Sequence, residues 1–349
     1  MGYPGETSKA LNADHHNICK YDSPQDPNYI VVRNVLKSLV SKVLVNAQFS
    51  SKPNLSLRRQ CRDLKTLLAI TALPDADYIF FRDQWTEGTG HWILDDKKYV
   101  EWFDPAEKDS ARILWLSGGP GTGKSVLSSL IIDEIVKQGC CCQYFFVRSS
   151  DQKKRSLSLL LRSVAYQLAG IVPAFLEKAL DVTNEGLDLG TADARMIWER
   201  LFKSAALSMR EIPRPLYWII DGVDEATDPR AVIKMLSDIH PDANVRLLFV
   251  SRRTSDTEAA FNRIPRALNP DSISIEARLE DLHLYIGREL DIAASAEFQA
   301  DVVKRLVEGA QNNFLVSSNI GSSPSYTDLL SVGTPCSREI ELMPYRSRY

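Results

Sequence analysis

The chain has 349 residues, of which 44% are hydrophobic and 25% are charged, a composition typical of a globular protein. Its 42 basic and 45 acidic side chains leave a net charge of −3, which excludes a strongly basic nucleic-acid-binding protein and a highly acidic disordered chain. No apolar run approaches the roughly 20 residues that a membrane-spanning helix needs, and we find no signal peptide. The six cysteines form no CxxC pair, so we expect reduced thiols in a cytoplasmic protein. The length of the chain predicts about two domains.

The N-terminal part of the chain is predicted to be mainly helical. After a polar stretch, Asp26 and Pro27 have the residue types of a helix N-cap and first helical position. Residues 56–72 carry apolar side chains at helical spacing and predict another helix. Residues 78–104 hold three of the six tryptophans. This segment is expected either to dock on the domain that follows it or to form a small core of its own.

From Ile113 onward the pattern changes to short apolar runs that alternate with helical segments. Strands are predicted at residues 113–116, 143–147, 216–220 and 246–250, and helices at 125–137, 157–168, 192–208, 279–291 and 297–310. Near-continuous apolar strands that alternate with helices are typical of a parallel sheet covered on both faces. The serine-rich stretch 317–349 has no apolar periodicity and is predicted to be disordered.

The strongest motif follows the first predicted strand and opens the first predicted helix of this region. It fits the pattern G-x-x-x-x-G-K-[ST], and its residues are Gly118, Gly119, Pro120, Gly121, Thr122, Gly123, Lys124 and Ser125. The N–H groups of such a loop and the positive N-terminal end of the following helix bind phosphate oxygens. We therefore predict a nucleoside-triphosphate site, with Lys124 on the β- and γ-phosphates and the Ser125 hydroxyl on Mg²⁺.

Acidic residues follow the apolar strand at 216–220, in the sequence Asp-Gly-Val-Asp-Glu. The carboxyl ends of parallel strands are where such sheets bind ligands. Asp221 is therefore predicted to hold Mg²⁺, through water. Asp224 or Glu225, just beyond the strand, is predicted to orient or activate the attacking water.

Polar residues also follow the strand at 246–250. If this strand lies between the other two, Ser251 or Arg252 faces the γ-phosphate. A cation there senses the phosphate and neutralises charge during transfer, which makes Arg252 a candidate catalytic residue. Arg148 and Arg155, around the strand at 143–147, could contact either phosphate or solvent, and solvent is the favoured expectation.

These motifs resemble the NACHT nucleoside-triphosphatase module, which belongs to the signal-transducing ATPases with numerous domains. The resemblance rests on the phosphate loop together with residues 219–225, Ile-Ile-Asp-Gly-Val-Asp-Glu. Residues 88–94, with Tyr99 and Trp102, are similar to the lead-in of NOD-like receptors of filamentous fungi and of nephrocystin-3-like N-terminal domains. The resemblance covers about residues 80–316.

The resemblance implies a nucleotide-driven signalling switch in self/non-self recognition or cell death. It implies slow hydrolysis of ATP or GTP with Mg²⁺, and protein partners or self-association rather than direct binding of nucleic acid. The base stays open between adenine and guanine. Two alternatives also stay open: a nucleotide-binding interaction module without turnover, and a non-functional truncated remnant.

Residues 1–45 carry a second resemblance, to the end of an α/β-hydrolase (lipase-like) domain. His15 or His16 would there be the triad base. The chain has no G-x-S-x-G nucleophile motif, so we expect this segment to have no acyl-transfer activity.

The predicted fold class is α/β: a three-layer α/β/α P-loop NTPase sandwich with a parallel sheet, a helical lead-in before it and an incomplete helical lid after it. The predicted segments are the hydrolase-like residues 1–45, the lead-in 46–110, the NTPase core 111–265, the start of the lid 266–316 and the tail 317–349.

Overall fold

A computed structural model describes the central part of the chain. The described residues are 55–71, 73–104, 111–208, 215–240, 243, 245–276 and 278–289. The hydrolase-like segment 1–45, the predicted helix 297–310 and the predicted disordered tail 317–349 lie outside these ranges.

Two compact units make up the structure, and each is described by itself. The helical unit comprises the chain up to residue 73 together with 132–143 and 158–217, and the sheet unit comprises 74–131, 144–157 and the chain from residue 218 onward. None of the described helices is long and apolar enough to cross a membrane.

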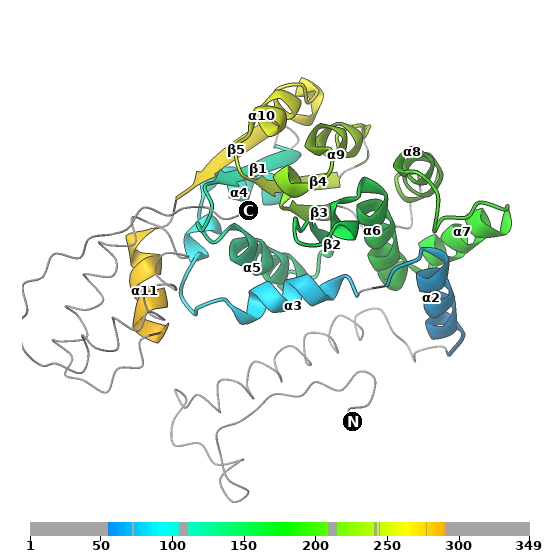
Figure 1. The fold of residues 1–349 in the computed structure, drawn as a ribbon, viewed down its shortest axis with the longest axis horizontal. Coiled ribbons are helices and arrows are strands. Elements are labelled where there is room, and N and C mark those ends of the chain that lie inside the picture. Colours follow the sequence, from blue (N-terminus) through cyan, green and yellow to red (C-terminus); the bar gives the residue numbers. More distant parts are fainter. Residues whose placement is uncertain are drawn as a thin grey trace, which may run out of the picture. The chain divides into compact units, whose positions relative to one another are not determined.

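A five-stranded parallel sheet is the main feature of the sheet unit, although the first residues of two strands are grouped with the helical unit (Figure 1). In spatial order its strands are β2 (Cys141–Phe146), β3 (Leu216–Asp221), β4 (Val245–Ser251), β1 (Ile113–Gly118) and β5 (Pro270–Ile275). β1 pairs in parallel with β4, where Ile113 is opposite Leu247, and with β5 on its other side. β4 thus lies between β1 and β3, as the site prediction required.

The central strands form because their residues are apolar almost without interruption. Every residue of β3 and of β4 is buried, and so are the first five residues of β1. A strand buried on both faces needs such a sequence, in contrast to the alternating pattern of a half-exposed strand. Since β1 and β4 are parallel neighbours, the residues that follow them emerge at the same edge of the sheet.

Helices cover both faces of this sheet (Figure 1). α9 (Pro229–Leu236) and α10 (Ser255–Phe261) lie on one face, and α3 (Asp75–Asp83) and the start of α5 (Lys124–Lys137) on the other. Asp228 and Thr254 cap α9 and α10 by accepting from backbone N–H groups in their first turns. The last described element of this unit is α11 (Leu279–Glu289).

The tryptophan-rich segment docks on the sheet, which settles the choice between docking and a separate core. It forms the short helical turn η1 (His91–Ile93) and the helix α4 (Lys97–Phe103). Trp102 of α4 is fully buried, and its indole N–H donates to the Leu247 carbonyl of β4 at 3.1 Å.

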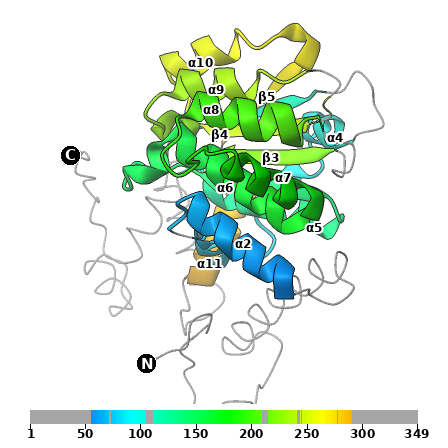
Figure 2. The same ribbon diagram turned by 90° about the vertical axis from the view of Figure 1, so that its right-hand side faces the viewer.

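Besides the end of α5, the described residues of the helical unit form further helical segments, of which α2, α6, α7 and α8 are labelled in Figure 2. They are α2 (Leu55–Leu67), α6 (Leu157–Ile171), α7 (Pro173–Asn184), α8 (Ala194–Ile197) and the π-helix η3 (Trp198–Ala206). α2 packs against α7, and α7 against η3. Within η3 the buried rings of Trp198 and Phe202 stack with their centroids 5.2 Å apart.

The structure corrects several predicted elements. β2 begins two residues before the predicted strand, and the helix predicted at 192–208 is a short α-helix that continues as the π-helix η3. The sequence analysis did not predict α7, α9, α10 or β5. β5 begins with Pro270 at the edge of the sheet, and half-exposed residues at its start break the apolar run.

We predict that Gly222→Ala destabilises the sheet unit. Gly222 follows β3 with a φ of 72°, and a Cβ added there would lie 2.6 Å from the Val147 carbonyl oxygen. Left-handed strain and overlap with backbone together cost about 3 kcal/mol of unfolding free energy, which denaturant unfolding measures. The matched control is Gly170→Ala in α6, where an added Cβ has no atom within 4 Å. Equal stability of the two variants would contradict the prediction.

Candidate functional site

A cavity of about 870 Å³ opens among the strand ends of the sheet unit. Its lining comes from the phosphate loop, the residues after β2, β3 and β4, the segment between α3 and η1, and α11. Cavities of this size hold small-molecule ligands and cofactors. Lys124 of the predicted phosphate site lines it, and so do all of the predicted catalytic and metal-binding residues: Ser125, Asp221, Asp224, Glu225 and Arg252.

The phosphate loop has the expected conformation. Gly121 and Gly123 have φ values of 73° and 78°, which side-chain-bearing residues rarely adopt, and α5 begins at the next residue, Lys124. The Lys124 ammonium donates to the Gly119 carbonyl of the same loop. Burial lowers the pKa of Lys124, and the nearby carboxylate of Asp221 acts in the opposite direction.

Asp221 connects this loop to the end of β3. Its Oδ2 accepts from the Ser125 hydroxyl at 2.6 Å, and its Oδ1 accepts from the Ser128 hydroxyl at 3.1 Å. Only 4% of Asp221 is exposed, and burial raises its pKa to about 6, although both hydroxyls and Lys124 favour the charged form. The sequence analysis missed Ser128, which lies one helical turn after Ser125 and so shares its face of α5.

The Ser125 hydroxyl and the Asp221 carboxylate together suit a divalent cation. Mg²⁺ prefers hard oxygen ligands, keeps several waters and is bound by one or two carboxylates together with substrate phosphates. A buried carboxylate 2.6 Å from a hydroxyl at the mouth of a phosphate loop fits that requirement.

Asp224, Glu225 and Arg252 form one ionic cluster. Arg252 donates to Asp224 through its backbone N–H at 2.9 Å and through Nε at 2.8 Å, and Nη2 lies 3.4 Å from Oε1 of Glu225. Glu225 also accepts from the backbone N–H of Ser149 at 2.6 Å. The structure therefore brings the three predicted catalytic residues together, with the two carboxylates held by one guanidinium.

Of the two residues proposed to face the phosphate, only Arg252 lines the cavity. Ser251 is buried: its hydroxyl accepts from the Trp115 indole N–H at 2.8 Å and donates to the Arg252 carbonyl. Ser251 thus fixes the strand end and does not face the ligand space.

The solvent-facing positions expected for Arg148 and Arg155 are wrong. Arg148 pairs with Asp77 of α3 at 3.3 Å, covers the Phe81 ring at 4.5 Å and lines the cavity. Arg155 donates to the Glu225 carbonyl at 3.0 Å. The partners of both arginines are about 70 residues away in the chain, so no local pattern could have revealed them.

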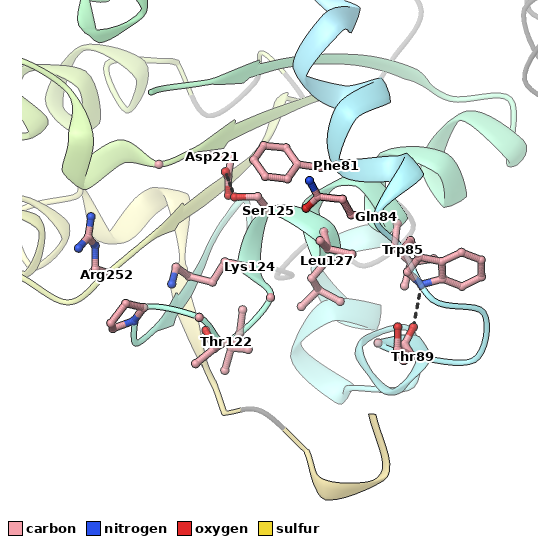
Figure 3. Close-up of a pocket in the computed structure, with 18 of the residues that line it drawn as sticks. Phe81, Gln84, Trp85, Thr89, Thr122, Lys124, Ser125, Leu127, Asp221 and Arg252 are labelled. Carbon is pink, nitrogen blue, oxygen red and sulfur yellow. Dashed lines mark hydrogen bonds between the residues drawn. The ribbon is translucent and has the colours of Figure 1, made fainter. Parts of the chain in front are cut away.

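Aromatic side chains form the other end of the cavity. Trp85 and Trp92 line it together with Thr89, whose carbonyl accepts from the Trp85 indole N–H at 3.0 Å, whereas Phe81 lies beside Asp221. Figure 3 shows Trp85 and Thr89 on one side of the phosphate loop and Arg252 on the other. The cavity therefore has a charged end and an aromatic end, with the loop between them.

Comparisons with known proteins show one family match and one distant relative. Residues 88–252 match the family described as nephrocystin 3, N-terminal. The vegetative incompatibility protein HET-E-1 of Podospora anserina is 26% identical over 197 residues, which are 52% of this chain. The chain spans 14% of the length of that relative.

Two solved structures are more distant. A DNA replication initiation factor has 13% identity and a TM-score of 0.38, over 71% of this chain and 63% of that chain. The Aeropyrum pernix ORC1 protein, in complex with DNA, has 14% identity and a TM-score of 0.37, over 73% of this chain and 62% of that chain. The fold assignment rests on the strand order described above.

The raised pKa of Asp221 predicts a pH dependence of stability. Because its folded pKa, about 6, exceeds the ordinary 3.8, the folded protein binds this proton more tightly than the unfolded chain does. The contribution is full below the ordinary pKa and is lost as the pH rises through about 6. Asp221→Asn should abolish this loss and raise the unfolding free energy above that pH by roughly 3 kcal/mol.

Urea unfolding of both proteins across this pH range measures the difference. Asp256→Asn, at a half-exposed carboxylate paired with Arg230, is the control and should keep the wild-type slope. Parallel pH curves for wild type and Asp221→Asn would contradict the prediction.

Proposed function

We propose that the chain, whose residues 88–252 match the nephrocystin 3 N-terminal family, is a nucleotide-binding signalling switch that hydrolyses ATP or GTP slowly. The observation that carries the proposal is the 2.6 Å hydrogen bond between Ser125 and Asp221, beside Lys124. It joins a phosphate-binding loop to a metal-binding carboxylate within one cavity. A cytoplasmic location and a part in self/non-self recognition or cell death belong to the same proposal.

The charged end of the cavity binds the phosphates. The loop N–H groups and the start of α5 bind phosphate oxygens, and Lys124 transfers its hydrogen bond from Gly119 to them. Ser125 and Asp221 hold Mg²⁺, which when bound neutralises charge on the phosphates. The aromatic end then receives the base, and its flat apolar surfaces accept adenine or guanine.

The ionic cluster explains why hydrolysis would be slow. Asp224 and Glu225 are the candidates for orienting water, but both contact Arg252, and Glu225 also accepts from Ser149. These bonds occupy carboxylate oxygens that would otherwise be free to hold the water. A γ-phosphate competes for Arg252, so its arrival releases a carboxylate toward the water.

We predict that Lys124→Ala weakens triphosphate binding by about 100-fold or more, because it removes charge-assisted hydrogen bonds to the phosphates. Isothermal titration with ATP, ADP, GTP and GDP in the presence of Mg²⁺ measures this and identifies the base. Lys137→Ala, at the exposed end of the same helix, is the control and should bind like wild type. Wild-type affinity in Lys124→Ala would overturn the proposed function.

Turnover is predicted to depend on the cluster. Glu225→Gln or Asp224→Asn should lower the rate of phosphate release by about 100-fold, the usual effect of removing a general base. Arg252→Ala should lower that rate while leaving diphosphate affinity unchanged. Release of radiolabelled phosphate at one rate in wild type, Asp221→Asn and Glu225→Gln would favour the interaction module without turnover. Failure of any nucleotide to raise the melting temperature would favour the non-functional remnant.

A further inference from the structure

One face of α11 lies against the lead-in loop, defined here as residues 84–93. Asp281, Tyr285 and Arg288 are spaced three or four residues apart, which places them on one side of the helix, and Arg278 comes directly before its first residue. Three of them contact the loop, and Asp281 and Tyr285 also line the cavity. This helix is therefore a wall of the cavity as well as a neighbour of the loop.

Asp281 makes the central contact. Its Oδ1 accepts from the backbone N–H of Gly90 at 3.1 Å, and its Oδ2 accepts from the Trp92 indole N–H at 3.2 Å. Each oxygen of one carboxylate thus holds a different donor of the loop. Burial raises the pKa of Asp281, and these two hydrogen bonds act against that shift.

Contacts on either side of Asp281 extend the attachment. The Arg278 guanidinium lies over the Trp92 ring, 4.1 Å from its centroid, and Arg288 donates to the Trp85 carbonyl at 3.1 Å. Between these points the loop lies close to the helix: a Cβ added at Gly88 would be only 3.2 Å from the Leu284 side chain.

The other side of the loop lies against α5. A Cβ added at Gly90 would be 3.0 Å from Leu127 and 3.4 Å from Leu130. Leu127 comes two residues after Ser125, so the lead-in loop packs against the same turn of α5 that carries the phosphate-binding residues. Thr89, Gly90 and Trp92 all line the cavity from this position.

We propose that Asp281 is a positioning residue of the nucleotide site: by binding Gly90 and Trp92 it fastens the lead-in loop to α11 and so slows release of the nucleotide. The proposal rests on the proposed function. Loss of the two hydrogen bonds frees one wall of the aromatic end, while the phosphate loop keeps all of its contacts. Release of di- and triphosphate should therefore accelerate by the same factor, since both share the base end.

The test compares Asp281→Ala, Asp281→Asn and the wild-type full chain. Alanine removes both acceptors, whereas asparagine keeps one acceptor oxygen and turns an NH₂ group toward the second donor. We expect release of a fluorescent ADP or ATP analogue to be about tenfold faster in Asp281→Ala, with an intermediate rate in Asp281→Asn. Glu280→Gln, an exposed neighbour on the same helix, removes an equal charge and should release nucleotide like wild type.

Hydrogen–deuterium exchange gives a second readout that needs no nucleotide. The Gly90 amide donates to Asp281, so peptides that contain it should exchange faster in Asp281→Ala, while peptides from β1 and β4 keep the wild-type rate. Faster exchange in those strands as well would indicate general destabilisation and overturn the proposal.

The remaining outcomes are distinct. A wild-type chain that binds no nucleotide overturns the proposed function and this inference with it. A wild-type chain that binds, with unchanged release or unchanged Gly90 exchange in Asp281→Ala, overturns the inference alone. If Asp281→Ala releases only the triphosphate faster, the substitution acts at the phosphates and not at the base, and the inference is also overturned.

Discussion

A buried carboxylate in an apolar sheet is unfavourable, and the site is arranged around the groups that stabilise the one at Asp221. Two hydroxyls of α5 donate to it, and the Lys124 ammonium lies nearby. Desolvation still prevails, since the pKa stays raised to about 6. A divalent cation bound at the proposed magnesium site would lower that desolvation cost.

Charge at the edge of the sheet is balanced locally. Asp224 and Glu225 share Arg252, and Asp224 has only 6% of its side chain exposed. The Arg252 side chain is 46% exposed, so water and salt still screen these pairs in part. The same contacts that hold the strand ends together therefore restrain the groups proposed for catalysis.

The tryptophans of the segment before the sheet have different roles that composition could not separate. Trp102 is a core residue whose indole N–H is satisfied by a β4 carbonyl. Trp85 and Trp92 line the cavity, and their indole N–H groups bind a loop carbonyl and a carboxylate of α11. Large aromatic residues combine apolar area with one polar handle, so they can join a loop to its surroundings while presenting a ring to a ligand.

The sequence by itself determined the parts of this protein that depend on local patterns. The phosphate loop needs glycines, lysine and serine at fixed spacing, and buried strands such as β3 and β4 need unbroken apolar runs, so both could be predicted. Short helices such as α9 and the edge strand β5 were missed because their patterns are short or broken.

Tertiary structure decided the rest. The place of β4 between β1 and β3 brings Arg252 into the cavity. The hydroxyl of Ser251 instead accepts a hydrogen bond from the Trp115 indole N–H. Arg148 meets Asp77 across 71 residues, and Asp281 meets Gly90 across 191. No periodicity or motif spans such separations, because these contacts exist only once the sheet has set the positions of the elements around it.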